Sequence, residues 1–92
     1  MIKRVANGSA YWTMSAIAFN GNYTLPFRVR GDADGTLTLK TDTIVLAAVP
    51  IQSCPQWQTY TCDFTCNGTS ALYFVYAGKG YLYFIDFMLV YD

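Results

Sequence analysis

The chain has 92 residues, of which 53% are hydrophobic and 17% aromatic, and its six basic and six acidic residues give a formal net charge of zero. Such a chain lacks the basic surface from which nucleic-acid binders gain most of their affinity, and it is too hydrophobic to be intrinsically disordered. Histidine and glutamate are both absent, which excludes imidazole metal ligands and the Ser-His and Cys-His catalytic pairs. We therefore expect one domain, spanning residues 1–92, that is not an enzyme.

No apolar run approaches the roughly 18 residues that a transmembrane helix needs. Lys3 and Arg4 are basic, but the continuous apolar stretch of a signal peptide does not follow them. The sequence therefore predicts neither a membrane partner nor a nucleic-acid partner. It leaves two settings open, inside a cell or within a longer secreted protein.

Alternation of apolar and polar residues, which is typical of half-buried strands, is the dominant pattern along the chain. It is weak over residues 10–18 and strong over residues 22–30, where every second residue is large and apolar: Tyr23, Leu25, Phe27 and Val29. Pro26 cannot donate a ladder hydrogen bond, so it predicts a sheet edge or a bulge. Further strands are expected over residues 36–40, with Leu37 and Leu39 inward, and over residues 43–49, which are apolar on both faces.

Three more strands are expected in the second half of the chain. Over residues 57–64, Tyr60, Cys62 and Phe64 share one face and Trp57 lies on the other. Residues 70–77 and 81–91 are long and aromatic, and the three residues between them, Gly78-Lys79-Gly80, predict a hairpin.

Turn chemistry separates most of the expected strands. It occurs at Asn7-Gly8, Asn20-Gly21, Asn67-Gly68 and in the loop over residues 31–35. No segment has the 3.6-residue period of an amphipathic helix. The sequence therefore predicts an all-β fold, a jelly-roll-like antiparallel β-sandwich of about seven or eight strands.

The three cysteines, Cys54, Cys62 and Cys66, leave at least one thiol unpaired within the chain. Cys62 and Cys66 would point to the same face of one extended segment, too far apart for a disulfide. A bond from Cys54 to either of them stays open, as does the alternative of three buried or half-buried thiols.

From residue 21 onward, the order and spacing of several segments resemble family 6 carbohydrate-binding modules. The matching segments are GNYTLPFRV at 21–29, 35–39, WQTYT at 57–61, GTSALYFVY at 68–76 and FIDFML at 84–89. The family's first strand, with the acidic residues that bind a structural calcium, has no counterpart here. The resemblance implies a non-catalytic, extracellular module of a secreted protein. It also implies a parent glycoside hydrolase and a plant-type polysaccharide ligand such as xylan or β-glucan.

The resemblance also implies that Trp57 forms one wall of a sugar cleft, since aromatic rings pack against the C–H faces of sugars. Tyr11 and Trp12 are adjacent, so one of them points outward and is the candidate for the opposite wall. A slip of one residue would exchange the two. Gln56 and Asn7 are the polar residues expected to orient the sugar. The alternatives are that Trp57 plugs the end of the core and that Tyr11 and Trp12 are ordinary core and surface residues.

Strict alternation places Asp86 on the same face as the apolar residues Phe84 and Met88, where a carboxylate is costly unless it is paired or bound to a cation. The resemblance implies that Asp86 helps to hold a structural calcium, the one cofactor that we consider. The alternatives are a salt bridge to Arg or Lys and plain exposure. Phe84 also stands where the family commonly has an asparagine that binds the sugar.

Two further features of the sequence bear on ligands. Arg28 and Arg30 share one face of a predicted strand and could hydrogen-bond a sugar or an anion. The segment Asp32-Ala33-Asp34-Gly35 looks like the start of an EF-hand loop, but the acidic residue required at the twelfth position is Thr43. A tight turn with Asx hydrogen bonds is therefore expected there.

A second hypothesis belongs to a different class of protein. The aromatic residues of the predicted C-terminal hairpin are too many to be buried together in a small domain, and a sandwich lacking a strand has an open edge. A structural or assembly β-sandwich subunit would use both features to form a homo-oligomer.

Overall fold

The computed structural model describes residues 3–13 and 15–92. Among these residues there is no helix that is long and apolar enough to cross a membrane. The described residues form nine strands: β1 (Lys3–Ala6), β2 (Ala10–Trp12), β3 (Ile17–Gly31), β4 (Asp34–Lys40), β5 (Val45–Ile51), β6 (Cys54–Ser70), β7 (Tyr73–Lys79), β8 (Tyr81–Phe87) and β9 (Val90–Tyr91).

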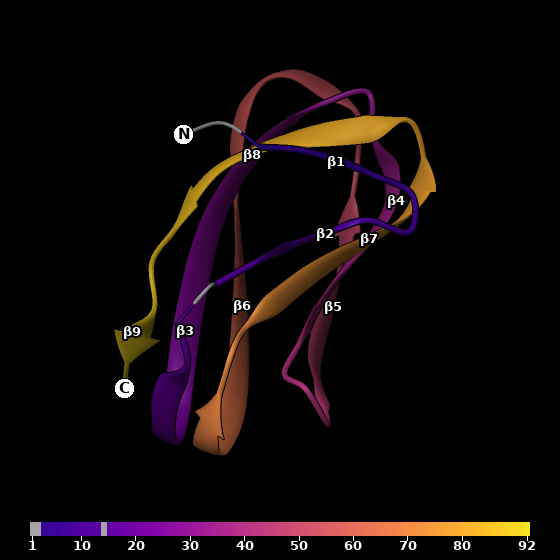
Figure 1. Ribbon diagram of the computed structural model, residues 1–92. Helices are drawn as coiled ribbons and strands as arrows, with labels where there is room; N and C mark the ends of the chain where they lie inside the picture. The colour runs from indigo at the N-terminus through magenta and orange to yellow at the C-terminus, as the bar shows by residue number, and fades with distance from the viewer. Residues whose placement is uncertain (1–2, 14) are drawn as a thin grey trace.

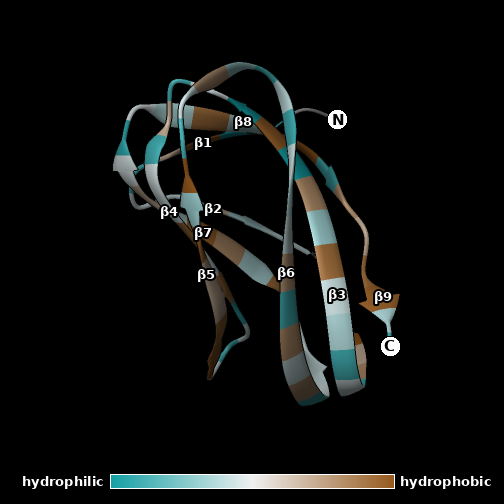
Figure 2. Cartoon of the chain, turned by 180° about the vertical axis from the view of Figure 1, so that it is seen from behind, coloured by the Kyte–Doolittle hydropathy of each residue, from teal (hydrophilic) through white to brown (hydrophobic). Residues whose placement is uncertain are grey.

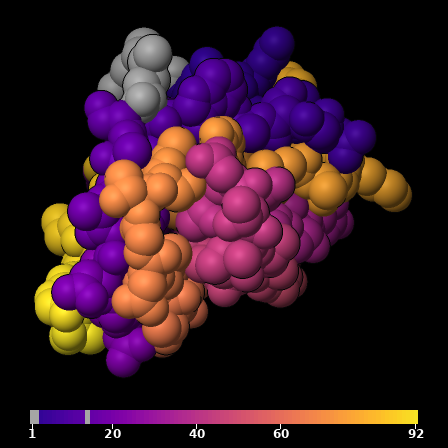
Figure 3. Space-filling model, turned by 60° about the horizontal axis from the view of Figure 1, so that its bottom comes forward, coloured from indigo at the N-terminus to yellow at the C-terminus, as the bar shows by residue number. Residues whose placement is uncertain are grey.

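The strands form two antiparallel sheets that pack face to face (Figure 1). Sheet A has the order β1-β8-β3-β6, with β9 also paired to β3, and sheet B has the order β2-β7-β4-β5. β5 and β6 lie beside each other although they belong to different sheets, and Figure 3 shows the magenta segment that leads into β5 next to the orange end of β6. The predicted antiparallel β-sandwich is therefore confirmed.

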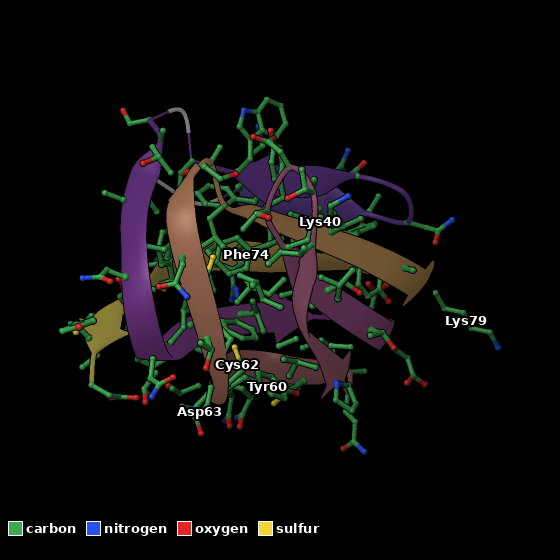
Figure 4. The ribbon with its side chains drawn as sticks, turned by 90° about the horizontal axis from the view of Figure 1, so that it is seen from below. Lys40, Tyr60, Cys62, Asp63, Phe74 and Lys79 are labelled. Carbon is green, nitrogen blue, oxygen red and sulfur yellow. The ribbon has the colours of Figure 1, made fainter. Side chains whose placement is uncertain are left out.

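The core lies between the sheets and is largely aromatic and aliphatic. In the middle of β3 every second residue is buried, as the alternation over residues 22–30 predicts: Tyr23, Leu25, Phe27 and Val29. The alternating bands along β3 are visible in Figure 2. Phe74 of sheet B lies inside the sandwich (Figure 4), with its ring centroid 4.8 Å from that of Phe84 in sheet A. Contacts of this kind hold the two sheets together.

The longest ladder joins β3 and β6, which lie side by side in Figure 1. It corrects two predicted turns, because Asn20-Gly21 and Asn67-Gly68 lie inside the ladder, with Asn20 paired to Asn67 and Gly21 to Cys66. Gly21 and Gly68 have φ angles of 124° and 100°, which only glycine adopts readily. These glycines therefore let two paired strands bend together instead of turning either strand back.

The predicted hairpin between residues 70–77 and 81–91 is wrong. β7 belongs to sheet B and β8 to sheet A, and the two strands do not pair. The chain crosses between the sheets at Gly80, which has a φ of 65°, and the backbone N–H of Tyr81 donates to Asp32 Oδ1 at 3.0 Å. The side chain of Asp32 thus ties the loop between β3 and β4 to this corner, instead of bonding its own backbone as the expected Asx turn would. Asn7-Gly8 forms the predicted turn, with Gly8 at a φ of 80°.

Pro26 lies in β3, an interior strand of sheet A, so of its two predicted positions, a sheet edge or a bulge, the edge is wrong. Its carbonyl accepts a hydrogen bond from the N–H of Met88 at 2.9 Å, and Met88 lies between the end of β8 and the start of β9. Because the N and O atoms of one strand residue point to the same side, the missing N–H of Pro26 faces this interruption. The proline therefore costs the sheet no ladder hydrogen bond.

Candidate functional site

The outer face of sheet A brings together two aromatic side chains and an arginine from three strands. The β3–β6 register shifts between Val29 and Gly31 and leaves Trp57 beside Arg30. The guanidinium carbon of Arg30 is 4.9 Å from the ring centroid of Trp57 and 5.7 Å from that of Tyr83 on β8. Arg30 and Tyr83 are paired in register, so they project from the same place on neighbouring strands.

The contacts continue across sheet A to its first strand. The rings of Tyr81 and Tyr83 meet edge to face, with centroids 5.9 Å apart. The guanidinium carbon of Arg4 on β1 lies 5.0 Å from the ring centroid of Tyr81. We call these five residues, Trp57, Arg30, Tyr83, Tyr81 and Arg4, the cation–aromatic row. The row crosses all four strands of the main path of sheet A and is open to solvent along its length.

A groove of about 320 Å³ lies beside the row. Arg28 and Thr59 are register partners and line it, each two residues from a member of the row along its own strand. Residues two apart in a strand share a face, so the groove and the row form one continuous surface. The other lining residues are Pro26, Phe27, Asp86, Phe87 and Met88.

Asp86 forms an ion pair in this groove. The Nε and Nη2 atoms of Arg28 donate to its two carboxylate oxygens at 2.9 and 2.5 Å. This bidentate contact lowers the pKa of Asp86 and raises that of Arg28. Both side chains are about half exposed.

The predicted role of Asp86 as a calcium ligand does not fit this geometry. The β3–β8 register shifts between Arg28 and Val29, since Val29 pairs with Phe84 and Arg28 with Asp86. The extra residue, Ile85, reverses the alternation and turns Asp86 to the outer face. In residues 3–13 and 15–92 no group of three or more acidic or cysteine side chains could hold a metal ion. The ion-pair alternative is the arrangement observed.

The structure does not bring Trp57 together with Tyr11 or Trp12. Tyr11 points into the sandwich and stacks on Phe84, with centroids 4.8 Å apart and planes 19° apart. Trp12, which is 50% exposed, pairs with Tyr73 on the outer face of sheet B. Because Trp57 lies on the outer face of sheet A, the predicted ring sandwich around a sugar does not form.

The two polar residues expected to orient the sugar also lie apart. Gln56 is exposed next to Trp57 at the start of β6. Asn7 follows β1, the strand at the other end of sheet A, and its Oδ1 accepts the backbone N–H of Gly78 at 3.0 Å. Asn7 thus stabilises a turn, whereas Gln56 stays a candidate for ligand contact.

Sequence reasoning singled out Trp57, Arg28 and Arg30 but did not place Tyr83 beside Arg30. The signal was present, because Arg28 and Arg30 share one face and residues 81–91 are rich in tyrosine. What the alternation could not show is that β8 lies beside β3 instead of pairing with β7.

Sheet B carries a smaller hollow of about 140 Å³, lined by Lys40, Thr41, Asp42, Tyr73 and Val75. The hydroxyl of Tyr73 donates to Asp42 Oδ1 at 2.7 Å, and this hydrogen bond raises the pKa of Tyr73. The contact ties β7 to the loop that follows β4.

All three cysteines are free thiols on β6. Cys66 is buried, whereas Cys54 and Cys62 are half-buried. Burial raises the pKa of both Cys62 and Cys66, and the neighbouring carboxylate of Asp63 raises that of Cys62 further. A thiol that resists deprotonation is a poor nucleophile, so Cys62 and Cys66 suit packing and not covalent catalysis.

No family model matches the chain, and no curated protein matches its sequence. Among solved structures, 19 chains match. One is a family 6 carbohydrate-binding module studied by crystallography and calorimetry, with a TM-score of 0.78 and 14% identity over 96% of this chain and 71% of that chain. The chain has the fold of a family 6 carbohydrate-binding module.

Two more of these structures were determined with ligands. The family 6 module from Clostridium cellulolyticum, in complex with xylose, has a TM-score of 0.75 and 14% identity over 92% of this chain and 74% of that one. The module CBM36, in complex with calcium and xylotriose, has a TM-score of 0.73 and 12% identity over 94% of this chain and 77% of that one. At these identities the likeness confirms the resemblance at the level of the fold.

Proposed function

We propose that this chain is a non-catalytic carbohydrate-binding module that takes a β-linked plant-type polysaccharide, xylan or β-glucan, on the outer face of sheet A. The observation that carries the proposal is the placement of Trp57 and Tyr83 on one open face beside a groove. The fold supports it, since two similar structures contain xylose and xylotriose.

The chemistry of the face suits a sugar chain. Aromatic rings offer flat apolar surfaces to the C–H faces of sugar rings while their polar edges stay in water. Trp57 is the anchor in this proposal, Tyr83 extends the platform, and the hydroxyl of Thr59 and the amide of Gln56 supply hydrogen bonds. A shallow open face buries little ligand area, so the expected dissociation constant is micromolar to millimolar.

The groove residues support binding without bond cleavage. Glycoside hydrolysis ordinarily needs two carboxyl groups that flank the scissile bond. Asp86 is the only carboxylate among the residues that line the groove, and Arg28 occupies both of its oxygens. We extend the proposal to an extracellular setting in which a parent glycoside hydrolase supplies the chemistry and this chain supplies the contact with the polysaccharide.

Titration of the folded chain with xylan, β-glucan, mannan and pectin, followed by calorimetry, tests the proposal. Trp57→Ala should weaken binding of the preferred polysaccharide by about thirtyfold, as expected for an aromatic anchor worth about 2 kcal/mol. Trp12→Ala is the matched control, because it removes the other tryptophan from the opposite face, and it should leave the affinity unchanged. A flat response of the folded chain to all four polysaccharides would refute the proposal.

A second candidate function, assembly of identical subunits, keeps one supporting observation. The predicted aromatic hairpin does not form, and of its residues Tyr76 and Phe84 are buried while Tyr81 is 37% exposed. However, three apolar side chains near the C-terminal strand are exposed: Met88 at 63%, Val90 at 39% and Tyr91 at 62%. Light scattering decides this candidate, since a monomer at millimolar concentration would eliminate it.

A further inference from the structure

We infer that the polysaccharide bound by the outer face of sheet A carries carboxylate groups, as a uronic-acid-bearing chain does. This inference rests on the proposed function and names the chemical class of its ligand. Its basis is the distribution of arginine over the molecule and the contacts that each arginine makes.

All three arginines of the chain lie on the outer face of sheet A, at positions 4, 28 and 30. Arg28 is neutralised by Asp86, which is the one salt bridge among the described residues. Arg4 and Arg30 instead lie against aromatic rings, at 5.0 and 4.9 Å from the centroids of Tyr81 and Trp57. The cation–aromatic row therefore holds two positive charges that no described carboxylate neutralises.

A guanidinium that lies over a ring keeps the N–H donors that point away from the ring. These donors lie at the edge of the group, in its plane. In the part of the chain that the structure describes, neither Arg4 nor Arg30 donates a side-chain hydrogen bond. These two edges are thus available to a ligand and are held in place by the rings of the row.

Besides Asp86, three acidic residues belong to this face, two of them far from the row and one beside it. Asp63 and Asp92 accept hydrogen bonds from Thr24 at 2.9 and 3.1 Å. Thr24 is six residues from Arg30 along β3, about 20 Å at the rise of a strand. Asp32 accepts the backbone N–H of Tyr81 at 3.0 Å. Within the described residues, the row therefore has two arginines without an ion pair and one carboxylate, Asp32, at its Tyr81 end, and two more carboxylates lie at the far end of the face.

A uronic acid matches both parts of the row. Its pyranose ring presents C–H groups to Trp57 or Tyr83, and its planar carboxylate can accept two parallel hydrogen bonds from one guanidinium. A neutral sugar has no negative group that could form an ion pair with Arg4 or Arg30. A sulfate ester shares the negative charge, but its tetrahedral shape does not match the planar guanidinium edge as a carboxylate does.

The experiment compares xylo-oligosaccharides of equal length, one unbranched, one with a glucuronic acid branch and one sulfated, by calorimetry at low and at high salt. The glucuronic acid branch should raise the affinity about tenfold at low salt, the value of one charge-assisted hydrogen bond pair net of desolvation. High salt should reduce that preference. The measured quantity is the ratio of acidic to neutral affinity.

Arg30→Gln together with Arg4→Gln should bring this ratio close to one. Lys40→Gln, which removes a cation from the outer face of sheet B, is the matched control and should leave the ratio unchanged. The thermal midpoint of each variant shows whether it is folded, and Arg30→Lys, which keeps the charge on a different donor geometry, should retain part of the preference.

Equal binding of the neutral and glucuronic acid ligands would overturn the inference while the proposed function stands. A stronger preference for the sulfated ligand, or an acidic preference that survives in the double variant, would also overturn it. Failure of all three ligands to bind would remove the proposed function itself, and the inference with it.

Discussion

The outer faces of the two sheets carry different basic side chains although both belong to one fold. The face of sheet A holds all three arginines, a half-buried tryptophan and a groove of about 320 Å³. The face of sheet B holds a more exposed tryptophan, Trp12, and a hollow of about 140 Å³ beside Lys40 and Asp42. The similarity of fold to other structures does not indicate which of the two outer faces binds a ligand, because each sheet presents one such face. The side chains differ, because sheet A carries the three arginines, two of them over aromatic rings, whereas the hollow of sheet B carries Lys40.

The largest effect expected is on the core that both faces share. Phe74 is fully buried and its ring lies 4.8 Å from that of Phe84 and 6.1 Å from that of Phe27, across the sandwich. Phe74→Ala should lower the free energy of unfolding by about 3–5 kcal/mol, through lost burial and the cavity left behind.

Denaturant unfolding can follow each sheet separately. In a Trp12→Phe background the fluorescence reports on sheet A through Trp57, and in a Trp57→Phe background it reports on sheet B through Trp12. With either tryptophan as the probe, Phe74→Ala should lower the free energy of unfolding by the same amount. A transition that shifts for Trp12 alone would mean that the sheets unfold independently, and the comparison of the two faces would then be a comparison of two separate units.

Two glycines test how closely the strands of each sheet approach one another. A Cβ atom on Gly78 of sheet B, at a φ of 150°, would lie 2.6 Å from Gly35 Cα, whereas one on Gly68 of sheet A, at a φ of 100°, meets nothing within 4 Å. Gly78→Ala should cost about 2–3 kcal/mol of unfolding free energy and Gly68→Ala about 1 kcal/mol, since the second change carries only backbone strain. Equal losses in chemical denaturation would contradict the close β4–β7 contact.

Thiol modification reports on sheet A alone, because all three cysteines lie on β6. The buried Cys66 should react with iodoacetamide more slowly than the half-buried Cys54, by tenfold or more if it reacts only through local opening. The modification rate of Cys62 should still increase with pH above about 8.5, the ordinary pKa of a thiol, because burial and Asp63 raise the pKa of Cys62. Peptide mapping by mass spectrometry gives the three rates. Faster modification of Cys66 than of Cys54 would show that β6 is more open than the structure has it.

The smallest expected effects are on stability, one at acid pH from a pair on sheet A and one at alkaline pH from a pair on sheet B. The pKa of Asp86 is lowered in the folded chain, so its pair with Arg28 on sheet A contributes stability above the unfolded value of about 3.9 and loses it as pH falls further. The pKa of Tyr73 is raised by Asp42, so that contact on sheet B contributes below about pH 10 and is lost as pH rises further.

Unfolding free energies measured across pH separate these two pairs. Asp86→Asn should flatten the acid limb of the stability curve and Asp42→Asn the alkaline limb. Both changes should be slight, because the two pairs are exposed to solvent. If Asp86→Asn altered the alkaline limb instead, the assignment of the Arg28 partner would be wrong.

The sequence by itself determined the class of fold and the strand faces. Alternation over residues 22–30 fixed which side of β3 faces the core, because side chains in a strand point to opposite faces in turn. The absence of histidine and glutamate limited the chemistry, and the outward position of Trp57 follows from its place opposite Tyr60 and Phe64. Each of these features depends on near neighbours in the chain.

Only the tertiary structure decided which strands are neighbours and in which register they pair. The β3–β6 ladder joins residues tens of positions apart, and no local pattern distinguishes it from two separate hairpins. The crossing at Gly80 placed β8 beside β3, which set Tyr83 against Arg30, and the extra residue Ile85 turned Asp86 outward to Arg28. Sheet membership and register depend on the total burial that the whole chain achieves, and a single added residue reverses every face that follows it.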